Sequence, residues 1–109
     1  MTRVEFFDQD GNISGFSVSG HSGYAEEGSD IVCASVTTAV QFAATTITDV
    51  LGVPAKTKVN EEKARITLTL PASYEDEDAV QAVLTGMMLT LCELRDQNPD
   101  YIEVIMEVQ

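Results

Sequence analysis

The chain has 109 residues, of which 44% are hydrophobic and 22% charged, a length and composition typical of one globular domain spanning residues 1–109. Six basic and eighteen acidic side chains leave a formal net charge of −12. Because binding to nucleic acids and to anionic membranes depends on basic residues, this charge argues against both partners and favours a basic protein or peptide.

The N-terminal sequence shows no apolar segment of the kind found in signal peptides. We therefore expect a cytoplasmic protein whose two cysteines, Cys33 and Cys92, stay reduced. The uncharged stretch from Ile31 to Thr48 is long enough to raise the question of a membrane span. Its many threonines favour a buried helix instead. Cys92 is expected on the apolar side of a second helix, in the hydrophobic core.

The first half of the chain predicts a hairpin, a loop and a helix. Residues 2–7 and 13–19 alternate apolar and polar positions around a turn cluster at 8–12, which predicts a β-hairpin. Residues 20–30 contain three glycines and no periodicity, and predict a loop. A helix is predicted from Ile31 to about Leu51, with Gly52 as its C-terminal cap. Its expected buried stripe consists of Val32, Val36, Ala39, Val40, Ala43, Ile47, Val50 and Leu51.

The second half predicts another hairpin, a helix and a last strand. The hairpin is expected at residues 55–60 and 64–70. Ser73 is the predicted N-cap of the helix, the acidic run 75–78 fits its first turn, and Asn98-Pro99 ends it. Its expected buried stripe consists of Val80, Val83, Leu84, Met87, Met88, Leu91 and Leu94. Tyr101 to Val108 is the last predicted strand.

Together these elements give the order ββαββαβ. Two helices with one apolar stripe each, and five strands with mostly one apolar face, predict an α+β two-layer sandwich in which both helices pack on a mainly antiparallel sheet.

The segment from Gly20 to Ala34 carries the reactive side chains. His21 is the single histidine of the chain, and Cys33 is expected in the first turn of the first helix, where the helix dipole and unpaired N–H groups favour a thiolate. A glycine-rich loop between them would let His21 reach Cys33, and a Cys–His pair is the minimum set for thiol catalysis. The loop residues expected to fold over a substrate are Gly20, Ser22, Gly23, Tyr24, Gly28 and Ser29.

Other interpretations of these residues stay open. A cysteine in an apolar helix is commonly a core residue, and a loop histidine is commonly structural. Asp30 fits a helix N-cap, with Ser29 as the alternative, and could also orient His21. One histidine and one cysteine, without further ligands at metal-binding spacing, predict no metal site, and we expect no other cofactor.

Two linked blocks, Gly20-His21-Ser22-Gly23-Tyr24-Ala25 and Gly28-Ser29-Asp30-Ile31-Val32-Cys33-Ala34, resemble the signature of the ribosomal-processing cysteine protease (Prp) family. The resemblance extends over the element order and the length of the chain. It implies a bacterial cysteine endopeptidase that removes an N-terminal extension from a large-subunit ribosomal protein. It further implies Cys33 as nucleophile, His21 as general base, Asp30 as the acidic residue of the motif, and a homodimer. Thr37 stands where family members commonly have serine, and it keeps the hydroxyl.

A different class of function is also consistent with the sequence. The chain could be a non-catalytic ribosome-assembly or interaction module that binds a basic protein through its acidic surface, with Glu75–Asp78 as part of that surface. This hypothesis predicts that Cys33→Ala and His21→Ala leave the activity intact.

Overall fold

The structure is a computed structural model that describes residues 1–20 and 27–109, and of residues 27–30 the backbone alone. Its elements follow the predicted order ββαββαβ, with a short π-helical turn after the first helix. They are β1 (Thr2–Gln9), β2 (Asn12–Ser19), α1 (Glu27–Thr45), the π-helical turn η1 (Thr46–Val50), β3 (Lys56–Asn60), β4 (Arg65–Thr69), α2 (Glu77–Gln97) and β5 (Ile102–Val108).

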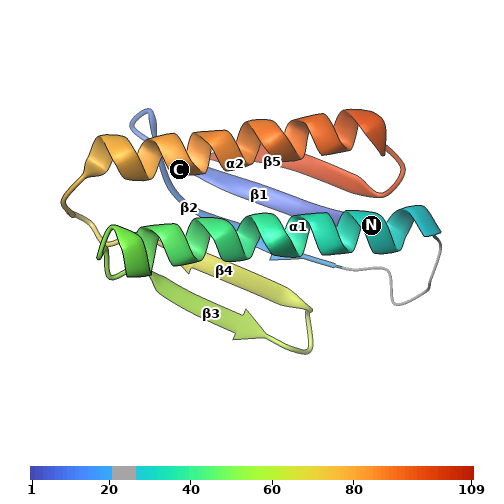
Figure 1. Cartoon of the computed structure of the whole chain (residues 1–109), viewed down its shortest axis with the longest axis horizontal. Coiled ribbons are helices and arrows are strands. Elements are labelled where there is room, and N and C mark those ends of the chain that lie inside the picture. The colour runs from blue at the N-terminus through green and yellow to red at the C-terminus, as the bar shows by residue number, and fades with distance from the viewer. Residues whose placement is uncertain (21–26) are drawn as a thin grey trace.

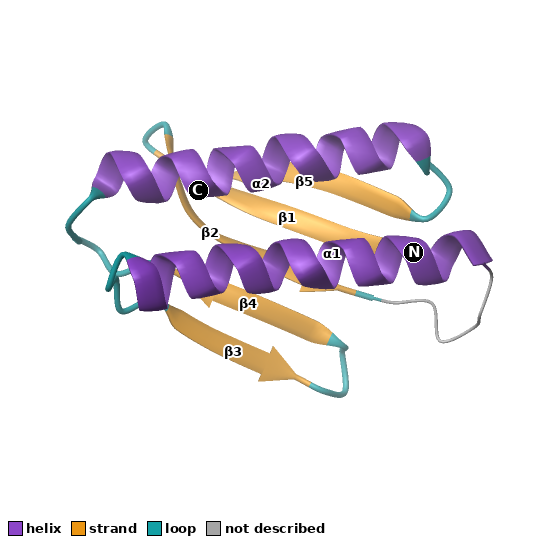
Figure 2. Ribbon diagram, viewed as in Figure 1, coloured by secondary structure: helices purple, strands orange, loops and turns teal. Residues whose placement is uncertain are grey.

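The five strands form one sheet in the order β3-β4-β2-β1-β5. Neighbouring strands are antiparallel except β1 and β5, which run parallel. Both helices lie side by side on the same face of the sheet (Figure 1), and within residues 1–20 and 27–109 the opposite face carries no helix (Figure 2). The predicted two-layer α+β sandwich with a mainly antiparallel sheet is therefore confirmed.

The hairpin of β1 and β2 turns at Asp10 and Gly11. Both have positive φ, 54° and 86°, as a two-residue turn that matches the twist of the strands requires. The pairing contains an irregularity between Phe7 and Asp8. Gly15 lies past this point, where a Cβ atom would collide with the backbone carbonyl of Leu68 on β4. A side chain at Gly15 would therefore separate β2 from β4.

The hydrophobic core fills the space between the helices and the sheet. Phe6 and Phe16 lie opposite each other on β1 and β2 with ring centroids 6.1 Å apart, within the range of favourable aromatic pairs. The largest fully buried side chains are Phe6, Phe16, Ile47, Leu68, Leu84, Leu91, Ile102, Val4, Val32 and Val80. Most of the predicted helix stripes thus face the core.

The first helix begins earlier than predicted. It starts at Glu27 rather than Ile31, so Gly28 and Ser29 belong to α1 and not to the loop. Ser29 and Asp30 lie inside the helix, and the prediction that either is its N-cap is wrong. The sequence suggested a later start because glycine disfavours a helix by about 1 kcal/mol. Extending a helix that has already formed adds a hydrogen bond per residue, which offsets that cost.

The end of the first helix also departs from the prediction. At η1 the Leu51 N–H donates to the Thr46 carbonyl at 2.9 Å, a π-helical bond that adds a residue to the turn. This extra residue shifts the phase of the stripe, so Val50 is 72% exposed rather than buried. Gly52 follows with φ of 69°, as predicted for the cap.

Over Ile31–Val50 this helix has a mean hydropathy of 1.5, a value and length that membrane spans also reach. Here its stripe of Val32, Val36, Val40 and Ala43 is buried in the core.

The second helix begins at Glu77, with Asp76 as N-cap, so the prediction of Ser73 as N-cap is wrong. Asp76 has a φ of 56°, outside the helical region, so the helix does not extend back through it to Ser73. The Gln81 side chain exchanges two hydrogen bonds of 2.8 Å with the backbone of Ile13, and it donates to the Tyr74 hydroxyl at 3.0 Å. These bonds join α2 to β2 and to Tyr74 in the segment before the helix. Cys92, predicted in the core, is half-buried.

Candidate active site

Cys33 lies on α1, close to the start of β1. The cysteine is a half-buried free thiol. Its Sγ atom lies 3.8 Å from the Oγ1 atom of Thr2, within hydrogen-bonding range for sulfur. Thr2 is the first residue of β1 and is 4% exposed. The candidate nucleophile therefore contacts a buried hydroxyl group of the sheet.

The thiol opens into a small pocket of about 110 Å³. The walls come from β1, the end of β2, α1 and the start of β4, which are distant in sequence. The lining residues are Thr2, Val18, Gly20, Cys33, Val36, Thr37, Ala64 and Ile66. Three residues singled out from the sequence, Gly20, Cys33 and Thr37, thus meet at one site.

Gly20 marks the point where the described chain leaves β2. Its φ is 72°, and a Cβ atom there would lie 2.5 Å from the carbonyl oxygen of Met1. Both observations require glycine, because a larger residue would be strained and would collide with backbone. The close approach fixes the end of β2 against the N-terminal strand, next to Cys33.

The relation of Cys33 to the helix start differs from the prediction. Since α1 begins at Glu27, Cys33 is its seventh residue and lies in the second turn. The unpaired N–H groups of a helix belong to its first turn, and the dipole effect falls off over the same distance. Cys33 therefore receives less from the helix N-terminus than the sequence suggested.

Several predicted site residues fall outside the described part of the chain. His21, Ser22, Gly23 and Tyr24 lie in the segment 21–26, which the structure does not describe. The side chain of Asp30 is likewise outside the description. Thr37 is described: it is exposed, one helical turn after Cys33, and lines the pocket.

Thr2 is the site residue that the sequence reasoning missed. It stands in the same alternation as Val4 and Phe6, all three buried on the helix-covered face of β1. A polar residue at a core-facing position needs a partner, because a buried hydroxyl without a hydrogen bond is costly. That signal was present in the sequence.

Two further features bear on function. A larger apolar groove of about 800 Å³ lies between α1 and α2, lined by Ala34, Ser35, Thr38, Ala39, Phe42, Ala82, Val83, Gly86, Met87 and Thr90. Within residues 1–20 and 31–109, no group of three or more His, Cys, Asp or Glu side chains could hold a metal ion.

Comparison with known proteins gives a consistent result. The model of the family described as Cysteine protease Prp matches residues 1–103. The ribosomal processing cysteine protease Prp of Bacillus subtilis (strain 168) is 27% identical over 101 residues, 91% of this chain and 90% of that protein.

Two solved proteins share the fold at lower identity. SMU.848 from Streptococcus mutans has a TM-score of 0.90 at 21% identity, covering 100% of this chain and 96% of that one. The ribosomal processing protease Prp from S. aureus, in complex with a substrate peptide, has a TM-score of 0.86 at 18% identity, covering 98% and 100%.

Proposed function

The chain belongs to the cysteine protease Prp family, and from this membership we propose that it is an endopeptidase with Cys33 as nucleophile and His21 as general base. The observation that carries the assignment is the shared pocket of about 110 Å³, which brings Cys33, Gly20 and Thr37 together. Of the two cysteines, Cys33 is the one that lines this pocket with residues of the signature. In this proposal residues 1–109 act as one cysteine protease domain.

The position of Gly20 supports the role of His21. Gly20 lines the pocket beside Cys33, and consecutive Cα atoms of a chain are about 3.8 Å apart. The residue that follows Gly20 is His21. This connection supports the proposal that His21 and Cys33 act as the pair that thiol catalysis requires.

The proposed reaction has two halves. His21 takes the proton of the Cys33 thiol, and the thiolate attacks the scissile carbonyl carbon to form a tetrahedral intermediate. The intermediate collapses to an acyl-enzyme when the peptide nitrogen leaves with the proton from His21. A water molecule, deprotonated by His21, then attacks the thioester carbonyl and releases the new carboxylate and the free thiol.

The oxyanion that forms on the scissile carbonyl needs hydrogen-bond donors at the pocket. Cys33 lies in the second turn of α1, so the free N–H groups of the helix start are not adjacent to it. Thr37 offers a hydroxyl at the same pocket, one turn further along the helix. We assign Thr37 as a donor to the substrate carbonyl oxygen. Asp30 is the acidic residue proposed to orient His21.

We propose an N-terminal extension of a large-subunit ribosomal protein as the substrate. The B. subtilis relative is named a ribosomal processing protease, and the S. aureus relative was solved with a substrate peptide. The net charge of −12 supports a basic substrate, because opposite charge raises the rate of encounter. We place this reaction in the cytoplasm, where the two free cysteines would stay reduced.

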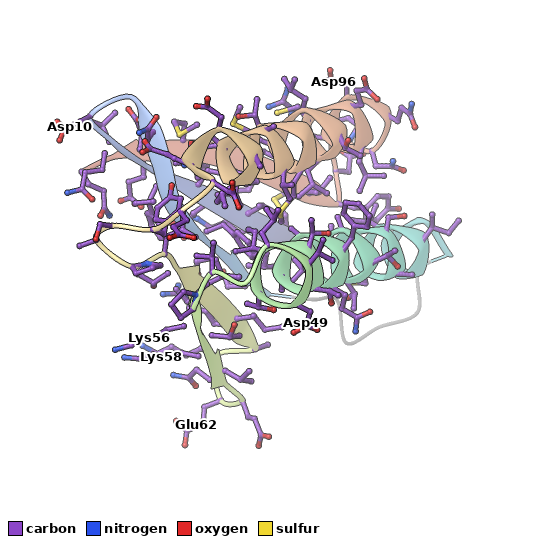
Figure 3. The ribbon with its side chains drawn as sticks, turned by 60° about the vertical axis from the view of Figure 1, so that its left-hand side comes forward. Asp10, Asp49, Lys56, Lys58, Glu62 and Asp96 are labelled. Carbon is purple, nitrogen blue, oxygen red and sulfur yellow. The ribbon has the colours of Figure 1, made fainter. Side chains whose placement is uncertain are left out.

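The charges are not spread evenly over the molecule. Four of the six basic residues lie in the β3–β4 hairpin: Lys56, Lys58, Lys63 and Arg65. Lys56 and Lys58 project from β3, and Glu62 lies at the hairpin tip, all well away from Asp96 on α2 (Figure 3). A basic precursor would therefore be drawn to the acidic remainder of the surface rather than to this hairpin.

The alternative, an interaction module without catalysis, rests on the acidic run Glu75–Asp78. This run leads into α2, and the start of α2 lies at the opposite end of the molecule from the start of α1 (Figure 1). The two hypotheses thus place the functional residues at opposite ends of a molecule 41 Å long, where they can be altered separately.

We also propose that two copies associate through the outward faces of α1 and α2. Phe42 lines the groove between the helices and is 68% exposed. Ile31, on the same side of α1 at helical spacing, is 59% exposed. Large exposed apolar side chains beside an apolar groove are typical of a protein–protein contact.

The proposed activity is tested with a precursor ribosomal protein and mass spectrometry of its N-terminus. We expect the purified protein to shorten the precursor, Cys33→Ala to abolish the shortening, and Cys92→Ala to retain it as the matched control. Cleavage at an unchanged rate in Cys33→Ala would reject the mechanism. Cleavage that survives His21→Ala at the same rate would reject His21 as the base.

A further inference from the structure

We propose that Thr2 is a positioning residue for the nucleophile, and that its hydroxyl donates a hydrogen bond to Sγ of Cys33 and stabilises the thiolate. The proposal rests on the assignment of Cys33 as nucleophile. The two atoms are 3.8 Å apart, and they join the first residue of β1 to the second turn of α1. Both residues also line the pocket of about 110 Å³.

The surroundings of Thr2 direct its hydroxyl to the sulfur. The residue is 4% exposed and has the buried Ile102 of β5 as its neighbour across the sheet. Its backbone N–H donates to the Tyr101 carbonyl at 2.9 Å, so the main chain is held in place. Among the described residues, the sulfur of Cys33 is the hydrogen-bond partner of the hydroxyl. The branched side chain of threonine also restricts its rotation.

The direction of the bond depends on the state of the sulfur. With a neutral thiol, either group can donate. Once the thiol has lost its proton, the hydroxyl is the one donor of the pair, and a bond to a charged acceptor is stronger than a bond to a neutral one. A donor that binds the charged form more tightly favours that form. Thr2 would therefore increase the fraction of Cys33 that is ready to attack.

The N-terminal residues of the chain also contact Gly20, on the other side of the pocket from Cys33. The Met1 carbonyl oxygen lies 2.5 Å from the position that a Cβ atom of Gly20 would take, and Thr2 contacts Cys33. Residues 1 and 2 are thus placed between the nucleophile and the residue that precedes the proposed base. This placement offsets the weaker contribution of the helix N-terminus to Cys33.

The test measures the reactivity of Cys33 directly, in the full chain with Cys92→Ser so that one thiol remains. Iodoacetamide alkylation is followed from pH 5 to pH 10 in this background, alone and with Thr2→Val or Thr2→Ser. Thr2→Val keeps the shape and removes the hydroxyl, and we expect it to slow alkylation at pH 7 by about three- to tenfold and to move the rate profile to higher pH. Thr2→Ser restores the donor and should keep the original profile.

An unchanged or faster alkylation in Thr2→Val would overturn the proposal, since the hydroxyl would then not donate to the thiolate. Circular dichroism confirms folding of each variant. If Thr2→Val does not fold, the pair Thr2→Ala and Thr2→Ser makes the same comparison. Cleavage of the precursor separates this proposal from the proposed function. Cleavage by Cys33→Ala would reject the proposed function. If Cys33→Ala is inactive but Thr2→Val is alkylated like its parent, the proposed function stands and only the role of Thr2 is rejected.

Discussion

Gly20 and Cys33 line the same pocket, although Gly20 directly follows β2 and Cys33 lies in the second turn of α1. The glycine is required there by its φ of 72° and by the Met1 carbonyl 2.5 Å from its absent Cβ. A backbone constraint at Gly20 therefore sets where the chain leaves the sheet beside the candidate nucleophile.

Gly20→Ala is expected to impair both stability and cleavage. A residue with a Cβ at positive φ costs about 1 kcal/mol, and the collision with Met1 adds to this cost. Gly11→Ala is the matched control, since its φ is also positive, 86°, but nothing lies within 4 Å of its Cβ. Urea denaturation and precursor cleavage should show a larger stability loss in Gly20→Ala, and a loss of activity in that variant alone. Equal cleavage by both variants would contradict the role of Gly20.

Thr37→Val should lower kcat/KM for precursor cleavage by about tenfold or more with little change in stability. The reason is the loss of a donor to the developing oxyanion at the pocket. Thr38→Val serves as the control, because the exposed Thr38 hydroxyl donates at 2.9 Å to the Ala34 carbonyl of its own helix. If both variants cleave at the wild-type rate, Thr37 has no part in catalysis.

The half-buried carboxylate of Glu5 makes the free energy of unfolding depend on pH. Burial of the side chain, 13% exposed, and its hydrogen bond with Glu107 raise the pKa of Glu5 above its usual 4.5, although Arg3 at 3.4 Å opposes the shift. A raised pKa means that the folded state binds the proton more tightly than the unfolded state. Protonated Glu5 therefore contributes to stability at acid pH, and this contribution is lost as the pH rises through the pKa of the folded state. Glu5→Gln should therefore be more stable than the wild type at pH 7.

Urea denaturation at pH 4, 5 and 7 measures this effect, and the gain in Glu5→Gln should shrink as the pH falls. Glu103→Gln is the control, because Glu103 is 43% exposed and lies 3.7 Å from Arg3. Because the ion pair of Glu103 with Arg3 is exposed, its loss should change the free energy of unfolding by less than about 0.5 kcal/mol. A Glu5→Gln variant that is less stable at pH 7 would mean that the attraction of Arg3 outweighs burial.

Phe42→Glu is expected to convert a dimer into a monomer in light scattering after gel filtration. The charge would disrupt an apolar contact between the outward faces of α1 and α2, without removing a core side chain. Val59→Glu is the control, since Val59 is 65% exposed on the edge strand β3, away from the groove. A dimer mass that persists in Phe42→Glu would place the contact elsewhere.

Neutralising Glu75, Asp76, Glu77 and Asp78 with their amides separates the protease from the interaction module. As a protease, the variant should lose only the part of kcat/KM that depends on ionic strength, because these residues steer the encounter. As a module, it should lose its binding to the basic partner. The change should also cost stability, since Glu77 accepts a hydrogen bond of 2.6 Å from Asn12 and two acids lie in the first turn of α2.

Local patterns in the sequence were sufficient for the elements and the layers. Alternation on β1 and β2, the Asp10-Gly11 turn and the helical spacing of apolar residues depend on neighbours in the chain, and the structure bears them out. The signature around His21 and Cys33 identified the family, which the match over residues 1–103 confirms. The catalytic roles of the two residues stay predictions.

Other features do not follow from local periodicity. Asp76 adopts a left-handed conformation at the start of α2, and a π-helical turn leaves Val50 exposed. The sequence by itself determined which residues could be reactive, because side-chain chemistry is local. Only the tertiary structure decided that Thr2 lies against Cys33. The two residues are 31 positions apart in the sequence, and their contact requires β1 and α1 to pack against each other.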